Sequence, residues 1–404
     1  MARGDGSGRI SHRSSLSGKS SLSYAALRRA VRARARLRPV HTTRLLTLAV
    51  RGLVAGTLVG LLLPPAPAQA YRLRGADLYV YGHSWTEGYG LRDRADRYPR
   101  LLAGRFGMTL HSRGVSGSQV HEAQERLFGS LGRPRGTWAS GAQGVVLIQA
   151  NLNTLRDFGA DPHALATARN SLRAMLATVG STARVEQSSR TFRYGGRWRA
   201  TARGVVPASG GSWRATYANG SYVQFRASGG EYVAVRGQAG AGPVMSVRDV
   251  TAGRTLARVD LSNQAHPAYA EGTTGIPYVY RVPRSAAGHL VRLVRAGGTG
   301  RLVFDVRLPQ DRTPNPVVIV KEPYLVDWSR STVHPNGSDA ATDAFNAVVD
   351  EVAREFPNVI VADPQRAGYW KSRRHLLDDG THPTVAGHLA LVRTVRDVTS
   401  RRLG

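Results

Sequence analysis

The sequence predicts an α/β protein in which a parallel sheet lies between two layers of helices and is interrupted by an all-β sandwich or jelly-roll insert. Three observations support this fold class. Apolar segments typical of buried strands alternate with helical patterns over residues 71–183 and again over 312–404. Residues 184–311 instead carry short segments of alternating polarity between Gly and Asn turns. The length of 404 residues suggests two or three units, and the β segment alone is long enough for its own core.

The first part of the α/β unit contains three expected strands and three expected helices in alternation. The first and third strands are short apolar runs, and the last helix carries apolar residues at helical spacing over 162–179. Alternation of this kind predicts parallel strands joined by helical crossovers. In chain order the segments are Asp77–Tyr81, Tyr98–Phe106, Met108–Ser112, Val120–Leu127, Gly144–Ala150 and Pro162–Val179.

The α/β pattern resumes after the β unit with two further strands and two helices. The expected strands are Pro316–Pro323 (PVVIVKEP) and Asn358–Ala362, and the expected helices are Ala340–Phe356 and Thr384–Leu403. The β unit is therefore inserted between the third and fourth strands of the parallel sheet.

Eight short strands are expected in the insert, because period-two alternation recurs between turn residues. They are Ser212–Tyr217, Tyr222–Ala227, Tyr232–Arg236, Val244–Val250, Leu256–Asp260, Tyr278–Val282, His289–Arg295 and Leu302–Leu308.

The composition excludes several classes of protein and leaves the meaning of the charge open. The chain has no Cys, which excludes disulfide scaffolds, thiolate metal sites and a Cys nucleophile. Its net charge of +29 comes almost entirely from Arg. No helix-turn-helix, RNA-recognition or zinc-finger pattern accompanies this charge, so we expect no nucleic-acid partner. A solvated Arg-rich surface and attraction to an anionic cell-envelope polymer are the two remaining interpretations.

The N-terminal segment has the pattern of an export signal. Residues 1–44 are rich in Ser, Arg and Gly and predict a disordered basic arm. Residues 45–70 follow with an apolar core, Gly52–Leu63, and a small-x-small site that predicts cleavage after Ala70. An uncleaved segment would instead be a membrane anchor, the only membrane contact that we expect. Both alternatives predict a secreted or cell-envelope protein.

Loops after the first three predicted strands carry residues suited to acyl transfer. Ser84 follows the first strand within GHSWTEGYG, where flanking glycines permit a tight turn that exposes its hydroxyl group. Gly117 follows the second strand and can present a backbone N–H, and Asn153 follows the third with a side-chain amide. The carboxyl ends of parallel strands meet at one edge, so these groups should gather there. Taken singly, each is more commonly a turn or cap residue.

A carboxylate and an imidazole lie together before the last helix. Asp379 and His382 stand in DGTHP, and their three-residue offset across a glycine lets the two side chains converge. We expect His382 to accept the proton of Ser84, with Asp379 fixing the orientation of the imidazole.

These segments resemble the sequence blocks of the SGNH hydrolases, also called GDSL-type esterases. The first block is similar to Gly82–Gly90 and implies the nucleophile at Ser84. The second resembles Gly114–Ser118 and implies an oxyanion glycine at Gly117.

The third and last blocks of the family are also matched. An apolar strand that ends in Gly-x-Asn-Asp is similar to VVLIQANLNTL at residues 145–155, which implies an oxyanion asparagine at Asn153. The last block is similar to DGTHPTVAGH at residues 379–388 and is the most specific match. The resemblance covers about 72–180 and 315–404, leaves out the β insert, and implies a flavodoxin-like three-layer parallel sheet.

The chain departs from the family pattern beside two of the implied functional residues. His83 stands where most members have the Asp that precedes the serine, and Asn151 and Thr154 replace the Gly and Asp around the oxyanion asparagine. We hypothesise that His83 replaces a supporting carboxylate and shifts the Ser84 loop.

Contacts with the substrate are open to two interpretations. His83, Trp85 and Trp370 could line a substrate groove, although the two aromatic rings could equally pack in the core. The β insert is either a platform that holds a glycan near Ser84 or a lid or wall of the cleft.

The expected function is that of an exported serine esterase that removes acyl groups, foremost acetyl, from a carbohydrate. The resemblance implies that N–H groups of Ser84 and Gly117 and the amide of Asn153 hold the oxyanion, and that no metal or organic cofactor is needed. The expected partner is an acylated carbohydrate or a small ester. An O-acyltransferase with the same triad, and an envelope glycan-binding protein with a decayed site, are the alternatives.

Overall fold

The structure is a computed structural model. It describes residues 73–128, 144–200, 209, 212–237, 242–262, 277–311, 314–325, 328, 336–370 and 373–403. The expected basic arm (1–44) and export segment (45–70) lie outside these residues. Within the described ranges, no helix is both long enough and apolar enough to cross a membrane.

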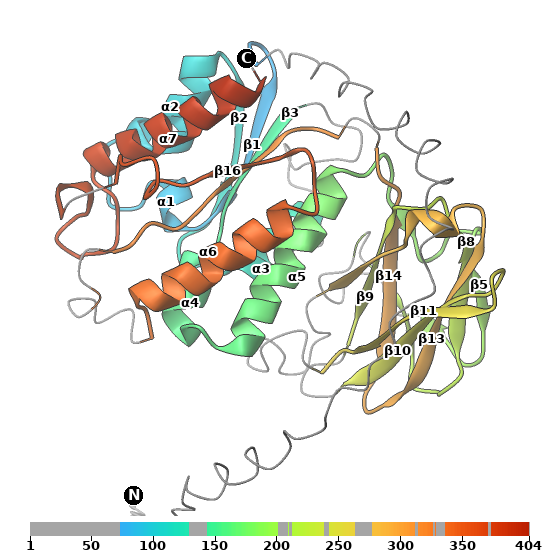
Figure 1. Ribbon diagram of the computed structural model, residues 1–404. Coiled ribbons are helices and arrows are strands. Elements are labelled where there is room, and N and C mark those ends of the chain that lie inside the picture. Colours follow the sequence, from blue (N-terminus) through green and yellow to red (C-terminus); the bar gives the residue numbers. More distant parts are fainter. Residues whose placement is uncertain are drawn as a thin grey trace, which may run out of the picture. The chain divides into compact units, whose positions relative to one another are not determined.

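A five-stranded parallel sheet forms the centre of the α/β unit (Figure 1). Its order is β16-β15-β3-β1-β2. Counted along the chain within this sheet, the order is 2-1-3-4-5, which is the flavodoxin-like order. The predicted fold class is confirmed. The strands are β1 (Asp77–Gly82), β2 (Thr109–Gly114), β3 (Gly144–Gln149), β15 (Val317–Val320) and β16 (Val359–Ala362).

Helices cover both faces of this sheet. One face packs on α3 (Val120–Phe128), α5 (Pro162–Val179) and α6 (Asp339–Ala353), and the other on α2 (Tyr98–Phe106) and α7 (Val385–Leu403) (Figure 1). Alternate residues of β3 belong to the two cores, because side chains of a strand point to opposite faces. Coverage of both faces explains why β1, β3, β15 and β16 are largely apolar, whereas the edge strand β2 carries polar residues and is only partly buried.

Two short helices directly follow strands and were not expected. They are α1 (Ser84–Glu87) after β1 and α4 (Leu152–Phe158) after β3. Each is too short to show an apolar period in the sequence. The longer helices agree closely with expectation, except that α6 ends at Ala353, three residues before Phe356. The ring of Phe356 instead stacks on Tyr232 of the β unit, with ring centroids 5.2 Å apart.

The β unit is a sandwich of two antiparallel sheets. One sheet has the order β11-β10-β13-β8-β5, and the other β12-β9-β14-β7-β6 with β4 beside β14. Apolar side chains from both sheets, among them Phe225, Val235 and Phe304, form the core between them. The strands are β4 (Val185–Glu186), β5 (Arg193–Gly195), β6 (Arg199–Ala200), β7 (Arg214–Thr216), β8 (Tyr222–Arg226), β9 (Tyr232–Arg236), β10 (Pro243–Asp249), β11 (Arg254–Asp260), β12 (Tyr278–Arg281), β13 (Leu290–Gly298) and β14 (Leu302–Leu308).

The sandwich packs on the helical layer at the carboxyl ends of the helices. Tyr232 and Val306 share one apolar core with α3 and α5. The Arg184 guanidinium donates hydrogen bonds to the carbonyl oxygens of Leu127 and Phe128 at the end of α3. Since the helices run antiparallel to the strands they follow, these contacts lie toward the amino ends of the parallel strands, away from the loops that carry the candidate site.

The chain enters and leaves the insert at adjacent points. Ser181 and Gln310 form an isolated bridge, the N–H of Thr182 donates to Pro309 O at 3.0 Å, and the N–H of Asp311 donates to Gly180 O at 2.8 Å. The two crossings are therefore paired like the base of a hairpin.

Candidate active site

The turn that carries Ser84 is built around a close approach that only glycine allows. At the end of β1, a Cβ on Gly82 would lie 2.1 Å from Thr86 Oγ1 and 2.4 Å from Gln149 O. Two residues later Ser84 begins α1, at the carboxyl edge of the sheet. This is the edge at which an open α/β sheet presents its ligand-binding groups.

The loop that carries Gly117 is fixed both by its own turn and by α1. The N–H of Ser118 donates to Val115 O at 3.1 Å, and Gly117 has φ +77 at the third position of this turn, a conformation that favours glycine. The N–H and hydroxyl groups of Ser116 donate to Glu87 Oε2 at 2.8 and 2.6 Å. The hydroxyl bond is the main reason that the pKa of Glu87 lies below its usual value.

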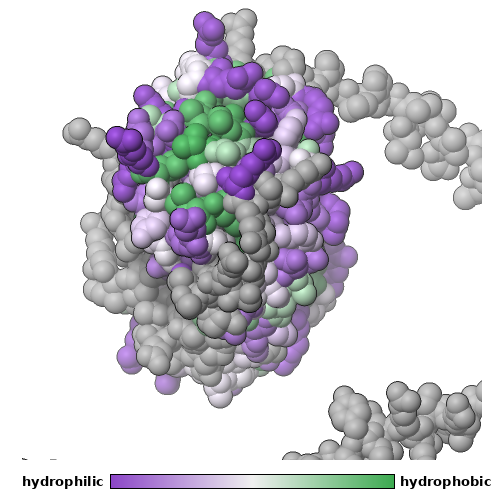
Figure 2. Space-filling view, turned by 90° about the vertical axis from the view of Figure 1, so that its left-hand side faces the viewer, coloured by the Kyte–Doolittle hydropathy of each residue, from purple (hydrophilic) through white to green (hydrophobic). Residues whose placement is uncertain are grey.

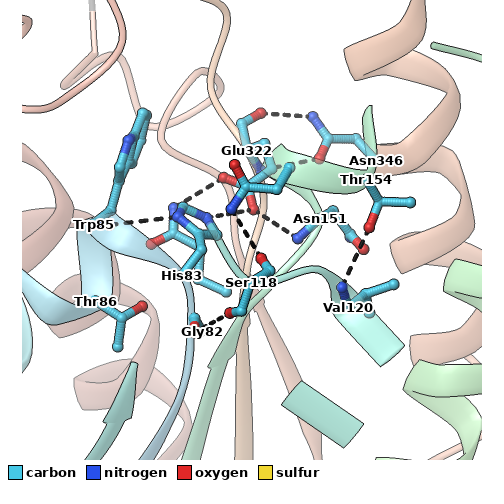
Figure 3. A network of polar contacts seen from close by, with 12 residues as sticks. Gly82, His83, Trp85, Thr86, Ser118, Val120, Asn151, Thr154, Glu322 and Asn346 are labelled. Atoms are coloured by element: carbon cyan, nitrogen blue, oxygen red, sulfur yellow. Dashed lines mark hydrogen bonds and ion pairs between the residues drawn. The ribbon is translucent and has the colours of Figure 1, made fainter. Parts of the chain in front are cut away.

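Asn153 joins this loop from the other side. In α4, its Nδ2 donates to Ser118 O at 2.8 Å, and Thr154 Oγ1 accepts from the N–H of Val120 at 3.2 Å (Figure 3 shows the Thr154 contact). An amide nitrogen carries two hydrogens, so Asn153 retains a second donor. The structure thus brings Asn153 to the loop of Gly117.

Asp379 and His382 form a direct pair. Asp379 Oδ2 lies 2.6 Å from His382 Nδ1, and Asp379 Oδ1 accepts from the N–H groups of Thr381 and His382, both at 2.9 Å. Burial raises the pKa of Asp379, but the hydrogen bonds from His382 and Thr381 outweigh it and hold that pKa below its usual value. A carboxylate at Nδ1 assigns the proton to that nitrogen and leaves Nε2 as the acceptor.

Tyr89 connects this pair with Ser84. Its N–H donates to Ser84 O at 3.0 Å, while its ring lies 4.4 Å from the His382 ring, centroid to centroid. The Ser84 hydroxyl and the His382 imidazole, both within the described residues, are not hydrogen-bonded to each other. Catalytic hydrogen bonds are often long before substrate binds. The structure therefore joins Asp379 to His382 and sets Ser84 in the neighbouring turn.

A buried hydrogen-bond network centred on Glu322 supports the Ser84 turn, and the sequence does not predict it. Glu322 is the second residue after β15, and its Oε1 lies 3.2 Å from His83 Nε2. The same carboxylate accepts from the N–H of Asn151 at 3.0 Å and from Gln149 Nε2 at 3.1 Å (Figure 3 labels His83, Asn151 and Glu322). The one clue in the sequence was a charged residue at the carboxyl end of a buried strand.

The three residues considered for substrate contact pack inside the protein. His83, Trp85 and Trp370 are 0%, 0% and 3% exposed. The two indole rings stack with centroids 5.2 Å apart, and Trp370 Nε1 donates to Tyr324 O at 3.0 Å. Because these side chains are buried, they support the site from within and do not line an open groove.

Exposed apolar side chains instead occur on the candidate catalytic loops. Tyr89 follows α1, Val115 lies in the Gly117 loop, and Val385 and Leu389 are in the first two turns of α7, and all four are exposed. The face that carries the amino end of α7 shows an apolar patch bordered by hydrophilic side chains (Figure 2). Contiguous exposed apolar surface often marks a contact site.

The second histidine of the DGTHPTVAGH segment, His388, is buried and contacts no carboxylate among the described residues. His388 Nδ1 accepts from the N–H of Tyr98 at 3.3 Å, and the rings of the two residues stack. Burial, with a smaller contribution from the charge of His382, lowers the pKa of His388 to about 4. Among the described residues, no group of three His, Asp or Glu side chains is arranged to hold a metal ion.

Comparisons with known proteins give remote structural likenesses only. No model of a protein family matches the chain, and no curated protein does. Similar solved structures include TesA, at 13% identity over 81% of this chain and 99% of that chain, TM-score 0.36. The hemagglutinin-esterase of infectious salmon anemia virus is 14% identical over 80% of this chain and 80% of that chain, with a TM-score of 0.36. LAE5, an alpha/beta hydrolase from the metagenome of Lake Arreo, Spain, is 13% identical over 82% of this chain and 97% of that chain, with a TM-score of 0.36.

At this level of similarity, none of these proteins identifies a substrate for this chain. The sheet order and the loops that carry Ser84, Gly117, Asn153 and His382 are observed in the structure itself. The fold that the resemblance to the SGNH hydrolases implies is therefore the fold of this chain's α/β unit.

Proposed function

We propose that this protein is a serine esterase with Ser84 as nucleophile, His382 as general base and Asp379 as the group that orients His382. The observation that carries the proposal is the short Asp379–His382 contact beside Tyr89, whose backbone is bonded to Ser84. A nucleophile, a base, an orienting carboxylate and oxyanion donors are what acyl transfer by serine needs.

The proposed reaction has two halves. Ser84 Oγ attacks the ester carbonyl as its proton passes to His382 Nε2, and the N–H groups of Ser84 and Gly117 with the Asn153 amide stabilise the oxyanion. The carbon–oxygen bond to the alcohol then breaks, and His382 protonates the leaving oxygen. Water attacks the acyl-enzyme, with His382 again taking a proton and returning it to Ser84 Oγ as the acid leaves.

The active nucleophile is tested by labelling with a fluorophosphonate probe, followed by mass spectrometry of the peptides. We expect one phosphonyl group on Ser84 and none in the Ser84→Ala variant. The variant should also lose ester hydrolysis by about 10⁴-fold or more. Absence of labelling in the folded wild-type protein would contradict the esterase proposal and favour a binding protein with a decayed site.

The proposed substrate is an acylated carbohydrate outside the cytoplasm, with acetyl as the acyl group. Its support is the export pattern over 45–70 and the resemblance of residues 211–237 to jelly-roll modules that occur beside or inside carbohydrate esterases. The exposed apolar residues Tyr89, Val115, Val385 and Leu389 offer contact with the alkyl part of an acyl group.

Two measurements test the substrate. A series of 4-nitrophenyl esters from acetyl to octanoyl should show the highest kcat/KM at acetyl, and an optimum at octanoyl would contradict the acetyl proposal. An O-acetylated polysaccharide should release acetate in a Ser84-dependent manner. Turnover that requires a sugar acceptor and outpaces hydrolysis would identify the protein as an acyltransferase.

A further inference from the structure

One buried carboxylate contacts both of the turns that carry the proposed catalytic groups. Glu322 Oε1 lies 3.2 Å from His83 Nε2 and 3.0 Å from the backbone nitrogen of Asn151. His83 directly precedes α1, in which Ser84 is the first residue, and Asn151 directly precedes α4, which contains Asn153. A single oxygen atom therefore links the nucleophile turn to the oxyanion turn.

The histidine transmits this contact to the nucleophile turn. His83 Nδ1 accepts from the N–H of Trp85 at 3.4 Å and so caps α1. A ring nitrogen that accepts there carries no proton, so the proton is on Nε2, which donates to Glu322. Both nitrogens of this fully buried ring are engaged, and the orientation of the first turn of α1 follows the position of Glu322.

Glu322 is itself held firmly. The side-chain amide of Asn346 in α6 accepts from the N–H of Glu322 at 3.1 Å and donates to its carbonyl oxygen at 2.9 Å (Figure 3). Gln149 Nε2 donates to the second carboxylate oxygen at 3.1 Å. The carboxylate thus has a fixed backbone and three N–H donors, which is what a buried charge requires.

We propose that Glu322 is a positioning residue that sets the separation of Ser84 from the oxyanion donor Asn153, acting through His83 and Asn151. The inference rests on the proposed esterase function. Misplacement of a reacting group by about 1 Å can lower a rate by about 10²-fold. A carboxylate that served only stability would change the melting temperature and leave kcat unaltered well below it.

The length of the side chain and its charge can be tested separately. Glu322→Asp keeps the carboxylate but withdraws it by one methylene group from both turns, so we expect kcat to fall by about 10²-fold. Glu322→Gln keeps the oxygen that faces His83 and Asn151. Its new amide can donate to Gln149 Oε1, a buried atom without a hydrogen-bond partner in the described part of the chain, once the Gln149 amide turns. We expect the loss in Glu322→Gln to stay within about tenfold.

Two substitutions of His83 separate its two contacts. His83→Gln retains the reach to Glu322 and gives up the cap on Trp85, whereas His83→Asn retains an acceptor for the cap and is too short for Glu322. We expect His83→Asn to match the kcat loss of Glu322→Asp and His83→Gln to lose less. Glu351→Asp is the matched control, because Glu351 pairs with Arg169 between α5 and α6 and should leave kcat unchanged.

The measurements are kcat and KM on 4-nitrophenyl acetate, the rate of fluorophosphonate labelling, and the melting temperature, all on the full chain. Positioning predicts that kcat and labelling fall together, with KM changing little, and with Glu322→Asp worse than Glu322→Gln. If the wild type is labelled and Glu322→Asp is labelled equally fast, this inference fails while the esterase proposal stands. If the wild type is not labelled at Ser84, both fail.

Discussion

The Asp379–His382 pair and the His83–Glu322 pair join the same two kinds of side chain at the same edge of the sheet. The first pair is local, three residues apart, and its side chains are 41% and 18% exposed. The second joins residues 239 apart in the chain, and its side chains are 0% and 1% exposed. The pair that we propose to act on substrate is partly exposed, and the pair that holds the backbone of two turns is buried.

The largest expected effect concerns the exposed pair. His382→Gln removes the proposed base, so kcat should fall by about 10⁴-fold while the melting temperature stays near that of the wild type. Steady-state kinetics and thermal unfolding monitored by circular dichroism measure the two quantities. A variant that kept one-tenth of the activity would show that another group accepts the proton.

The carboxylate of the same pair should come next. Asp379→Asn keeps the shape of the side chain but no longer favours the proton on His382 Nδ1, so kcat should fall by about 10³-fold. This loss should exceed that of Glu322→Gln, and equal losses would erase the functional distinction between the two pairs. Hydrolysis of 4-nitrophenyl acetate by both variants gives the comparison.

The two pairs should rank in the opposite order when the loss of stability is measured in place of the loss of kcat. Glu322→Ala leaves three buried N–H donors without their acceptor and should lower the free energy of unfolding by about 3–5 kcal/mol. Asp379→Ala removes a half-exposed group and should cost about 1 kcal/mol at most. Urea unfolding of both variants measures the difference, and a smaller cost for Glu322→Ala than for Asp379→Ala would contradict this view.

The buried residue His388, which belongs to neither pair, should make the stability of the protein depend on pH. The pKa of His388 is about 4 in the folded protein and about 6.5 when unfolded, so the unfolded state binds the proton first. Stability should be complete above pH 6.5 and fall by about 3 kcal/mol as the pH drops to 4. Urea unfolding across this range should show a shallower fall for His388→Asn, and an unchanged slope would assign the pH dependence to other groups.

The smallest effect is expected at the residue that links the exposed pair to Ser84. Tyr89→Leu removes the ring that lies against His382 and keeps the backbone bond to Ser84, so kcat/KM should fall by about 2–10-fold. Kinetics on 4-nitrophenyl acetate measure it. A loss as large as that of His382→Gln would mean that Tyr89 takes part in the chemistry.

The difference between the two pairs also explains what could be predicted from the sequence. Asp379 and His382 are neighbours in one loop, so their spacing alone indicated the contact that the structure shows. Strands β1, β3, β15 and β16 were likewise visible, because burial on both faces leaves a largely apolar run. The roles of Ser84, Gly117 and Asn153 in catalysis remain predictions.

The residues that the sequence did not reveal depend on long-range packing. Glu322 contacts His83 because β15 and β1 lie on the two sides of β3 in the sheet. No local sequence pattern encodes this strand order. Trp85 and Trp370 were equally compatible with a substrate groove and with the core until their stacking was known. The two-residue strands β4 and β6 are too short for any alternation to be recognised.

The paired crossings at Ser181 and Gln310 bear on how such a two-part protein is assembled and diversified. Because the chain returns to the place it left, a graft of any size there leaves the register of the parallel sheet untouched. The inserted unit nonetheless contributes to the packing of the α/β unit, since Tyr232 and Val306 complete the apolar core of α5. A replacement module would have to offer an equally apolar sheet face, so the exchange of whole modules at this junction is limited by surface chemistry and not by connectivity.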